Sequence, residues 1–414
     1  MTYPDHRRLG RQLRIFASDE LCGAGLPLWL PAGAAVRGEL ERFVVDLERR
    51  HGYQHVYTPE LAKQELYERS DHWAHYRDDM YPPMQVGAEQ VVLRPMNCPH
   101  HILVYAAEPR TMRDMPVRLA ELGTMFRFER SGVVGGLSRV RQMTLNDGHV
   151  FCAPGDVRAE VTAILGLVEK AYEALAIPAP SYRLSLRGPG SKYVGDPAVW
   201  AKSEAVLRTS LDDLGVAYCE AQGEAAFYGP KIDLQVTDPR GREETLSTVQ
   251  VDFHLPERFA LSYQDGPVSV RPVMIHRSIV STMERMVAHL LEVHDGALPV
   301  WLAPSQVVIM PVVTDAVDHA RRLREALQTE AIRAELDDRD ATLGSRVRDA
   351  QQRRVPYLAV VGRREVEDGT VAVRLRGGEQ LGTLSTEAFV ALVSEVARRR
   401  LPSLTAAMAV AVAP

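Results

Sequence analysis

A change of pattern at residues 298–304, LPVWLAP, divides this sequence into two unequal parts. Long amphipathic segments and pairs of antiparallel strands are expected before it, and alternating strands and helices after it. With 414 residues, the chain is also too long for a single hydrophobic core. The sequence therefore predicts two domains, residues 1–299 and 300–402, and a tail, residues 403–414, that is too short to form a core.

The second part predicts a mixed sheet flanked by helices, because its elements follow the order β-α-β-α-β-β-α. Its strands are expected at residues 307–312, 332–336, 357–361 and 371–375, and its helices at 316–327, 343–354 and 386–400.

The first part predicts longer helices and antiparallel strands. Leu40, Phe43, Val44 and Leu47 recur at helical spacing, and Gly52 marks the expected end of that helix. Strands are expected at residues 126–130 and 140–151, joined by a glycine-rich loop, and residues 182–223 read as a less ordered insert.

Residues 140–152, VRQMTLNDGHVFC, alternate with period two. One face of such a strand carries Arg141, Met143, Leu145, Asp147, His149 and Phe151. Charged groups on one strand face are unusual for a plain core strand. On the expected partner strand, Arg127 and Glu129 share a face, and an arginine there can grip a phosphate or carboxylate. The alternative interpretation is a network of ion pairs on a solvated sheet face.

Composition excludes several classes of protein. The 49 basic and 54 acidic residues give a net charge of −5, which argues against a protein that holds nucleic acid by bulk charge. Four cysteines are too few for a disulfide scaffold and predict a cytoplasmic location. No apolar run is long enough to span a membrane.

Several motifs, in order along the chain, resemble threonyl-tRNA synthetases, a family of class II aminoacyl-tRNA synthetases. They are RPMNCPHH (94–101), FRFERSGVVGGLSRVRQMTLNDGHVFC (126–152), AFYGPKID (226–233), TVQVDF (248–253) and VMIHRSIVSTMERM (273–286). The resemblance implies an α/β fold: an α+β catalytic domain with an antiparallel sheet flanked by helices, then a smaller α/β anticodon-binding domain with a mixed sheet. It also implies L-threonine, ATP with Mg²⁺ and tRNA-Thr as substrates, and a homodimer formed through the helix before Pro59.

The same resemblance implies that Cys98, His149 and His276 bind one zinc ion and leave its fourth position open. Zinc bound by the amino group and hydroxyl of threonine would exclude valine, which a hydrophobic pocket alone rejects weakly. Asp147 would accept a hydrogen bond from that hydroxyl. Without the resemblance, Cys98 is equally a small buried hydrophobe. His100 is a competing ligand, although a place beside the site or at the surface is expected for it.

Serine also has the hydroxyl, and loss of one methyl group changes binding by only about 1–3 kcal/mol. The family generally removes seryl-tRNA with an N-terminal editing domain, whereas this sequence begins at the catalytic core. The expectation is a protein that activates serine as a near-cognate substrate and does not hydrolyse Ser-tRNA in cis.

Further residues match family positions with a role in the reaction. The resemblance implies that Arg127 meets the α-phosphate, Glu129 the adenine amino group and Arg139 the outer phosphates. The residues matched to catalysis are Arg127, His72, Arg285 and Lys231, with His72 assisting the attack of the tRNA ribose. Those matched to ATP are Arg127, Glu129, Arg139, Met143, Gln250 and Arg285. Those matched to the amino acid are Met96, Asp147, Tyr228, Gln250 and Thr282.

The sequence departs from the family pattern inside these motifs. The departures are His100 and Ser281 for glycine, Met143 for phenylalanine, Leu145 and Thr245 for glutamine, and Thr282 for serine. Leu145 removes a hydrogen-bonding amide, and Ser281 adds bulk where backbone approaches the nucleotide. These changes put catalytic efficiency in doubt.

In the second part, Asp340, Glu365 and Arg374 match residues that read anticodon bases in the family. Asp340 replaces an asparagine, which would loosen or shift the anticodon preference. Arg346, Arg348, Arg353 and Arg354 form a basic cluster that could meet phosphates; the alternative is a solvated helix face. The leading interpretation is a threonine–tRNA ligase. A specialised paralogue (an inhibitor-resistant copy or a biosynthetic supplier) and a non-catalytic tRNA-binding regulator are the alternatives.

Overall fold

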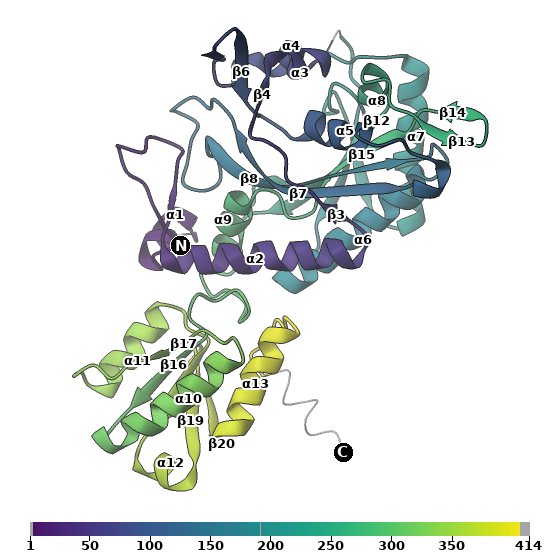
Figure 1. Ribbon diagram of the computed structural model, residues 1–414. Coiled ribbons are helices and arrows are strands. Elements are labelled where there is room, and N and C mark those ends of the chain that lie inside the picture. Colours follow the sequence, from purple (N-terminus) through teal and green to yellow (C-terminus); the bar gives the residue numbers. More distant parts are fainter. Residues whose placement is uncertain (1–2, 191, 406–414) are drawn as a thin grey trace.

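A computed structural model describes residues 3–190 and 192–405. Figure 1 shows a larger part built on a twisted sheet and, below helix α2, a smaller part with its own sheet. Among the described residues, none of the helices is both long and apolar enough to cross a membrane. Most of the predicted tail, residues 406–414, lies outside the described residues, so its form stays a prediction.

The larger part is organised by one mixed, mainly antiparallel sheet, which comprises eight strands within the described residues. In spatial order they are β10 (Tyr218–Gln222), β9 (Ser181–Leu186), β11 (Lys231–Thr237), β12 (Glu243–Asp252), β15 (Val273–Ser278), β8 (Gln142–Cys152), β7 (Val117–Phe126) and β3 (Gln54–His55). Only the outermost pairs, β10 with β9 and β3 with β7, are parallel.

Helices cover this sheet and short strands edge it. The helices are α1 (His6–Gln12), α2 (Pro31–Arg50), α3 (Gln64–Arg69), α4 (His72–Tyr76), α5 (Cys98–Ala106), α6 (Val157–Leu175), α7 (Pro197–Leu214), α8 (His254–Arg258) and α9 (Met283–Val293). The short strands are β1 (Phe16–Ala17), β2 (Leu28–Trp29), β4 (Leu61–Lys63), β5 (Met84–Val86), β6 (Glu89–Leu93), β13 (Tyr263–Asp265) and β14 (Val268–Val270).

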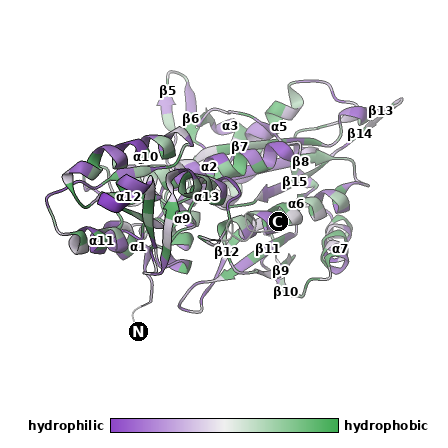
Figure 2. Cartoon of the chain, turned by 90° about the horizontal axis from the view of Figure 1, so that it is seen from below, coloured by the Kyte–Doolittle hydropathy of each residue, from purple (hydrophilic) through white to green (hydrophobic). Residues whose placement is uncertain are grey.

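Helix α2 shows why these segments are helical. Its apolar residues Val36, Leu40, Phe43 and Val44 recur every three or four positions and are all buried. Pro31 stands in the first turn, where its missing N–H is not needed. Gly52, at φ +80°, follows the end of the helix, as the sequence predicts. Most of the helices carry both hydrophilic and hydrophobic residues, as Figure 2 shows.

Two expectations for the larger part are wrong. Residues 127–130 are not a strand, because pairing of β7 with β8 ends at Phe126. Residues 182–223 are ordered rather than loose: they contain part of β9, the 18-residue helix α7 and β10. Leu207 and Leu211 pack in the main cluster with the sheet, and Trp200 packs with Tyr193 and Ala225, so α7 is held on both sides.

The smaller part is the predicted mixed sheet, whose described strands stand in the order β17-β16-β18-β19-β20. Its elements are β16 (Val307–Pro311), α10 (Val317–Thr329), β17 (Ala334–Leu336), α11 (Leu343–Gln352), β18 (Tyr357–Val361), α12 (Arg363–Asp368), β19 (Thr370–Leu375), β20 (Gln380–Ser385) and α13 (Thr386–Arg398). Helix α12 and strand β20 were not predicted from the sequence. The first three strands are parallel and the last two antiparallel.

Separate hydrophobic clusters fill the two parts and meet at the connecting segment. Trp301 and Leu302 pack in the cluster of the larger part, whereas Val300 packs in the cluster of the smaller one. The segment 298–302 is therefore buried from both sides, and the boundary at residues 299 and 300 stays a prediction.

Candidate functional site

A cavity with a volume of 770 Å³ lies among strands β8, β11, β12 and β15 of the larger sheet. Most residues predicted for the site line it: Met96, Cys98, Arg127, Glu129, Arg139, Met143, Asp147, Tyr228, Lys231, Gln250, His276, Thr282 and Arg285. His149 and His72 are fully buried and do not line it. The arrangement brings residues from distant parts of the sequence to one place.

Strand β8 supplies one wall of the cavity through the face predicted from its alternation. Met143, Leu145 and Asp147 line the cavity, and His149 lies directly opposite His276 of β15 in the antiparallel register. Asp147 is only 6% exposed, and burial raises the pKa of its carboxyl group.

Three buried side chains meet where β8, β15 and the start of α5 converge. The Sγ of Cys98 and one ring nitrogen each of His149 and His276 lie within 4.8 Å of one another. His149 Nε2 and His276 Nδ1 are 3.1 Å apart. One thiolate and two imidazoles are a ligand set that suits zinc and leaves a fourth position open.

The remaining nitrogens of both histidines point away from this group to hydrogen-bonding partners. His276 Nε2 lies 2.8 Å from Asp252 Oδ2, and His149 Nδ1 lies 2.7 Å from His101 Nδ1. His101 Nε2 in turn lies 3.1 Å from Glu121 Oε2. Such outer hydrogen bonds fix the orientation of metal-binding imidazoles. The donor set and its supports therefore fit a metal ion.

Sequence reasoning missed His101, Glu121 and Asp252. Glu121 also accepts hydrogen bonds from Arg94 Nη2 at 3.1 Å and from the Thr58 hydroxyl at 2.8 Å. His101 and Arg94 stand inside the quoted motif 94–101, which was a usable signal. Asp252 likewise stands inside the motif 248–253, whereas Glu121 reveals itself only through strand register, which sequence spacing does not give.

The surroundings of Cys98 and His149 disfavour the charged forms of these side chains when no metal ion is bound. Burial, followed by the carboxylates of Asp147 and Asp252, raises the pKa of the Cys98 thiol. Burial and the neighbouring imidazoles lower the pKa of His149, so this ring is neutral and keeps a lone pair. A buried cation would stabilise the Cys98 thiolate and satisfy both carboxylates.

Four arginines line the same cavity: Arg127, Arg139 and Arg285, and Arg277, which pairs with the buried Glu48 at 2.6 Å. Arg139 pairs with Glu129 at 2.8 Å. Arg285, in the first turn of α9, donates from Nε to the Ser138 carbonyl at 3.4 Å, and burial lowers the pKa of its guanidinium. Guanidinium groups gathered in a cavity suit polyphosphate.

Another wall carries the polar residues expected for the amino acid. The Tyr228 hydroxyl donates to Gln250 Oε1 at 2.7 Å, and its ring stacks on His276 with centroids 4.6 Å apart. Lys231 pairs with Asp233, which also accepts from the Ser185 hydroxyl at 2.8 Å. Thr245 accepts a hydrogen bond from Gln235 at 2.6 Å.

His72 is enclosed by other side chains. Its Nδ1 lies 2.8 Å from the Ser70 hydroxyl, and its Nε2 has no partner within the described part of the chain. Burial lowers the pKa of His72 to about 3. His75, three residues later, lines the cavity instead and stacks on Phe227 at 4.3 Å.

His100 is not part of the Cys98 group and is not at the surface. It is 5% exposed, packs edge-on against Tyr67 at 6.3 Å, and burial lowers its pKa to about 4. The expected surface position is therefore wrong, and a place beside the metal-binding group stays a prediction.

In the smaller part, Asp340 and Glu365 follow the carboxyl ends of the parallel strands β17 and β18, which meet at one edge of the sheet. Glu365 Oε2 accepts the Gly362 N–H at 2.8 Å. Arg374, on β19, lies opposite Leu358 in the register of β19 with β18. Leu358 is three residues before the end of β18, which is about 10 Å along the strand. The three residues therefore span the sheet rather than form one point of contact.

The predicted basic cluster on and after α11 does not exist as a group. Arg346 is 5% exposed and donates from Nη1 to the carbonyls of Pro311 and Asp337. Arg353 pairs with Glu335, and Arg354 pairs with Asp295 of the larger part. Arg348 is exposed, as a solvated helix face predicts.

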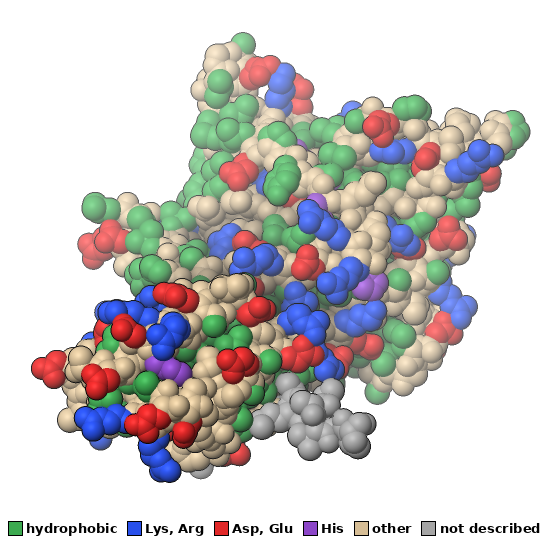
Figure 3. Space-filling model, turned by 60° about the horizontal axis from the view of Figure 1, so that its bottom comes forward, with side chains coloured by type: hydrophobic (Ala, Val, Ile, Leu, Met, Phe, Trp, Pro, Cys, Tyr) green, Lys and Arg blue, Asp and Glu red, His purple; other side chains and the backbone are tan. Residues whose placement is uncertain are grey.

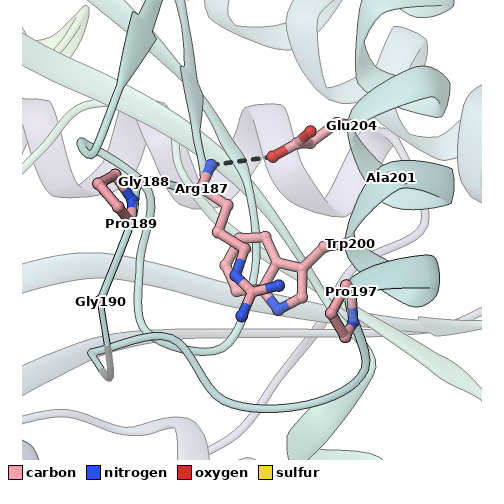
Figure 4. Close-up of a pocket in the computed structure, with 8 residues that line it drawn as sticks. All are labelled: Arg187, Gly188, Pro189, Gly190, Pro197, Trp200, Ala201 and Glu204. Carbon is pink, nitrogen blue, oxygen red and sulfur yellow. Dashed lines mark hydrogen bonds between the residues drawn. The ribbon is translucent and has the colours of Figure 1, made fainter.

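A second pocket lies beside the loop before α7 (Figure 4). The Arg187 guanidinium lies 5.7 Å from the centre of the Trp200 ring, and its backbone N–H donates to Glu204 at 2.9 Å. Trp200 donates to the Val194 carbonyl at 2.7 Å. These contacts tie the described residues 187 and 194 to helix α7.

Fold and cavity define a class II aminoacyl-tRNA synthetase. Residues 83–294 match the tRNA synthetase class II core domain (G, H, P, S and T), and residues 306–396 match the anticodon binding domain. A crystal structure of the RNA-binding domain of threonyl-tRNA synthetase from Cryptosporidium parvum is 32% identical, with a TM-score of 0.90 over 95% of this chain and 98% of that one. The chain belongs to the threonyl-tRNA synthetase family.

Curated relatives agree. Threonine–tRNA ligase from Halalkalibacterium halodurans is 50% identical over 400 residues, covering 95% of this chain and 62% of that protein. Threonine–tRNA ligase 1 from Bacillus subtilis is 50% identical over 391 residues, covering 93% and 61%. The chain thus spans about three fifths of the length of these relatives. A putative threonyl-tRNA synthetase from Aeropyrum pernix has a TM-score of 0.84 at 26% identity, covering 97% of each chain.

Proposed function

We propose that this chain activates L-threonine with ATP to threonyl-adenylate and transfers the threonyl group to tRNA-Thr. One observation carries the proposal: Cys98 and His276 of the buried Cys98–His149–His276 group and Asp147 line one cavity with Arg127, Arg139 and Arg285. The first set suits a small hydroxyl-bearing amino acid, and the second suits polyphosphate. Activation requires both substrates to be held side by side.

Cys98, His149 and His276 would hold one zinc ion per chain. Bound there, zinc would take the amino group and the side-chain hydroxyl of threonine, which valine lacks. Asp147, with its carboxylate at the same wall, would accept the hydroxyl hydrogen bond. Tyr228 and Gln250, already bonded to each other, would close the amino-acid pocket beside His276.

The arginines would act on ATP, which we expect with Mg²⁺. Arg127 would stabilise charge on the α-phosphate as the threonine carboxylate attacks it, and Arg139 and Arg285 would hold the outer phosphates. Glu129 would accept from the adenine amino group, and Met143 would pack on the base. Arg139 must exchange its pairing with Glu129 for phosphate when ATP enters.

His72 and Lys231 stay predicted catalytic residues. In this arrangement His72 has no path to solvent, so assistance to the tRNA ribose would require the α4 segment to move when tRNA binds. Asp340, Glu365 and Arg374 are proposed to contact the anticodon. Helix α2 is proposed as part of a homodimer interface. The cytoplasmic location stays a prediction.

Exchange of pyrophosphate into ATP tests the proposal when it is measured with threonine, serine and valine and followed by charging of tRNA-Thr. We expect strong exchange with threonine, weaker exchange with serine and none with valine. No exchange with any amino acid would favour a non-catalytic tRNA-binding protein. Exchange without charging would favour a specialised paralogue, a possibility to which Leu145 in the cavity wall gives weight.

A further inference from the structure

The loop of residues 127–141, which joins β7 to β8, carries three cavity residues: Arg127, Glu129 and Arg139. Within the loop, Arg139 pairs with Glu129, and Arg141 Nε donates to the Glu129 carbonyl at 2.9 Å. Both contacts are internal, so they do not fix the position of the loop relative to the rest of the cavity.

Residues near the N-terminal end hold this loop from outside. A methyl group built on Gly136 would lie 2.3 Å from His6 Nε2 and 2.8 Å from Arg7 Cγ. Gly136 also has φ +55°, a left-handed conformation that favours glycine. Further along, the Arg141 N–H donates to the Gly25 carbonyl at 2.7 Å. The loop therefore rests directly on the His6 side chain.

His6 is itself fixed to the helix that carries Arg285. Its backbone N–H and its Nδ1 lie 3.1 and 2.8 Å from Glu292 Oε1, near the end of α9. The residue is 7% exposed. Asp5 accepts the N–H groups of Arg7 and Arg8 and so caps α1. One imidazole thus stands between the loop with Arg139 and the helix with Arg285.

We propose that His6 is a positioning residue that sets the loop of Arg139 against helix α9, and so prepares the site for the phosphates of ATP. The inference rests on the proposed function, since it takes ATP as the ligand of these arginines. Without His6, the loop would be held less firmly, by contacts such as the Arg285 Nε bond to the Ser138 carbonyl and the Arg141 N–H bond to the Gly25 carbonyl. More of its ordering would then occur when ATP binds, and that ordering lowers affinity. Threonine, on the opposite wall, would bind as before.

The test compares the wild-type chain with His6→Ala and His6→Asn. An asparagine amide can replace Nδ1 as the partner of Glu292, but it removes the ring edge that contacts Gly136, so this variant separates folding from loop support. Gly132→Ala is the matched control, because it lies in the same loop and its methyl group would meet nothing within 4 Å. Direct binding of Mg·ATP is measured by calorimetry, and pyrophosphate exchange is measured beside it.

We expect the Kd for Mg·ATP and the KM for ATP to rise about tenfold in both His6 variants. The KM for threonine should stay within about twofold of the wild-type value. Gly136→Ala, which pushes the loop off His6, should raise the ATP constants similarly, whereas Gly132→Ala should not. Unchanged ATP affinity in a folded His6→Asn chain would overturn the inference.

If His6 only contributes to packing, its variants should have a smaller active fraction, with the KM for ATP and the KM for threonine both unchanged. That result would also overturn the inference. ATP binding without threonine-dependent exchange in the wild type would instead defeat the proposed function, while the comparison of Kd values would still decide the role of His6.

Discussion

Cys98 lies in surroundings that oppose its own ionisation. Burial raises the pKa of its thiol, and two carboxylates add to the effect. The raised pKa alone fits a protonated core thiol, and it is the grouping of Sγ with ring nitrogens of His149 and His276 that favours a ligand role; a thiolate would be stable there beside a cation. Its place at the first position of α5 adds partial positive charge from free backbone N–H groups.

We therefore expect Cys98→Ala to lose zinc and threonine activation together. Metal content per chain by mass spectrometry and threonine-dependent pyrophosphate exchange measure the two losses. Cys152→Ala is the control, because Cys152 is also a buried cysteine, on β8, but lies outside the group of three. One zinc per chain in Cys98→Ala would contradict the assignment.

Glu121 is expected to contribute strongly to stability. Burial alone would raise its pKa, but hydrogen bonds from His101 and Thr58 and the charge of Arg94 lower it to about 2. Since the folded pKa lies below the unfolded value, this stability is fully present above about pH 4.5 and is lost as the pH falls toward 2.

Glu121→Gln should thus lower the free energy of unfolding at pH 7 by about 3 kcal/mol, the equivalent of the pKa shift. It should also flatten the fall in stability between pH 4.5 and 2. Urea titrations across this pH range measure both effects. Glu108→Gln, whose carboxylate is 69% exposed, serves as control and should change neither. Parallel pH profiles for wild type and Glu121→Gln would contradict the expectation.

At the scale of elements, the turn that begins α9 holds a local conflict. Ser281, at φ +57°, occupies a left-handed conformation that is unfavourable for residues with a Cβ by about 1–2 kcal/mol. Its carbonyl accepts the Asn146 N–H at 3.0 Å, which ties the turn to β8 and holds the strained conformation in place. The family glycine would adopt it without that cost.

Ser281→Gly should raise the free energy of unfolding by about 0.5–1 kcal/mol, since relief of strain exceeds the entropy that glycine gains in the unfolded chain. Ser281→Ala should give no gain because it keeps the Cβ. Denaturant midpoints at equal slope measure the difference. Ala205→Gly, at an exposed interior position of α7, is the reference for an ordinary helix position and should destabilise by about 1 kcal/mol. A loss in both glycine variants would refute the strain argument.

Elements with strong periodicity could be predicted from the sequence, whereas their connections could not. The alternation of residues 143–149 correctly identified the face of β8 that lines the cavity, because successive residues of a strand point to opposite faces. The strand at 126–130 was misplaced because Arg127 and Glu129 also fit a strand pattern, and only pairing with β8 shows where β7 ends. Helix α7 was missed although its buried residues Trp200, Ser203, Leu207 and Leu211 recur at helical spacing.

For the site, the motifs gave the residues that contact the cavity but not those that support them. Glu121 and Asp252 are placed by strand register and His101 by the packing of α5, and the contact of His6 with Gly136 joins segments 130 residues apart. No local pattern encodes such contacts. The buried state of His72 and His100 likewise depends on how α4 and α5 pack.

At the scale of the whole molecule, side chains of both signs are interspersed on the smaller part, as Figure 3 shows. The net charge of −5 gives no general attraction for RNA. Correct placement of the anticodon-binding part relative to the cavity should therefore matter more than bulk charge. That placement depends on a few contacts across the connecting segment, including the Arg376 bond to the Leu298 carbonyl at 2.6 Å and the Arg354–Asp295 pair.

Arg333 makes more contacts across the connecting segment than Arg354 or Arg376. It donates from Nη2 to the Trp301 carbonyl at 2.7 Å and from Nε to the Ala303 carbonyl at 3.0 Å, and it pairs with Glu39 of α2 at 2.5 Å. We expect Arg333→Ala to leave threonine-dependent pyrophosphate exchange within about twofold, because neither Arg333 nor its partners line the cavity. The kcat/KM for charging tRNA-Thr should fall about tenfold, since a tRNA that spans both parts requires their fixed geometry.

The control is Arg321→Ala, which removes an exposed arginine of α10 that pairs with Asp318. This variant should alter neither rate. An equal fall of exchange and charging in Arg333→Ala would show that this arginine supports the fold of the larger part rather than the placement of the smaller one.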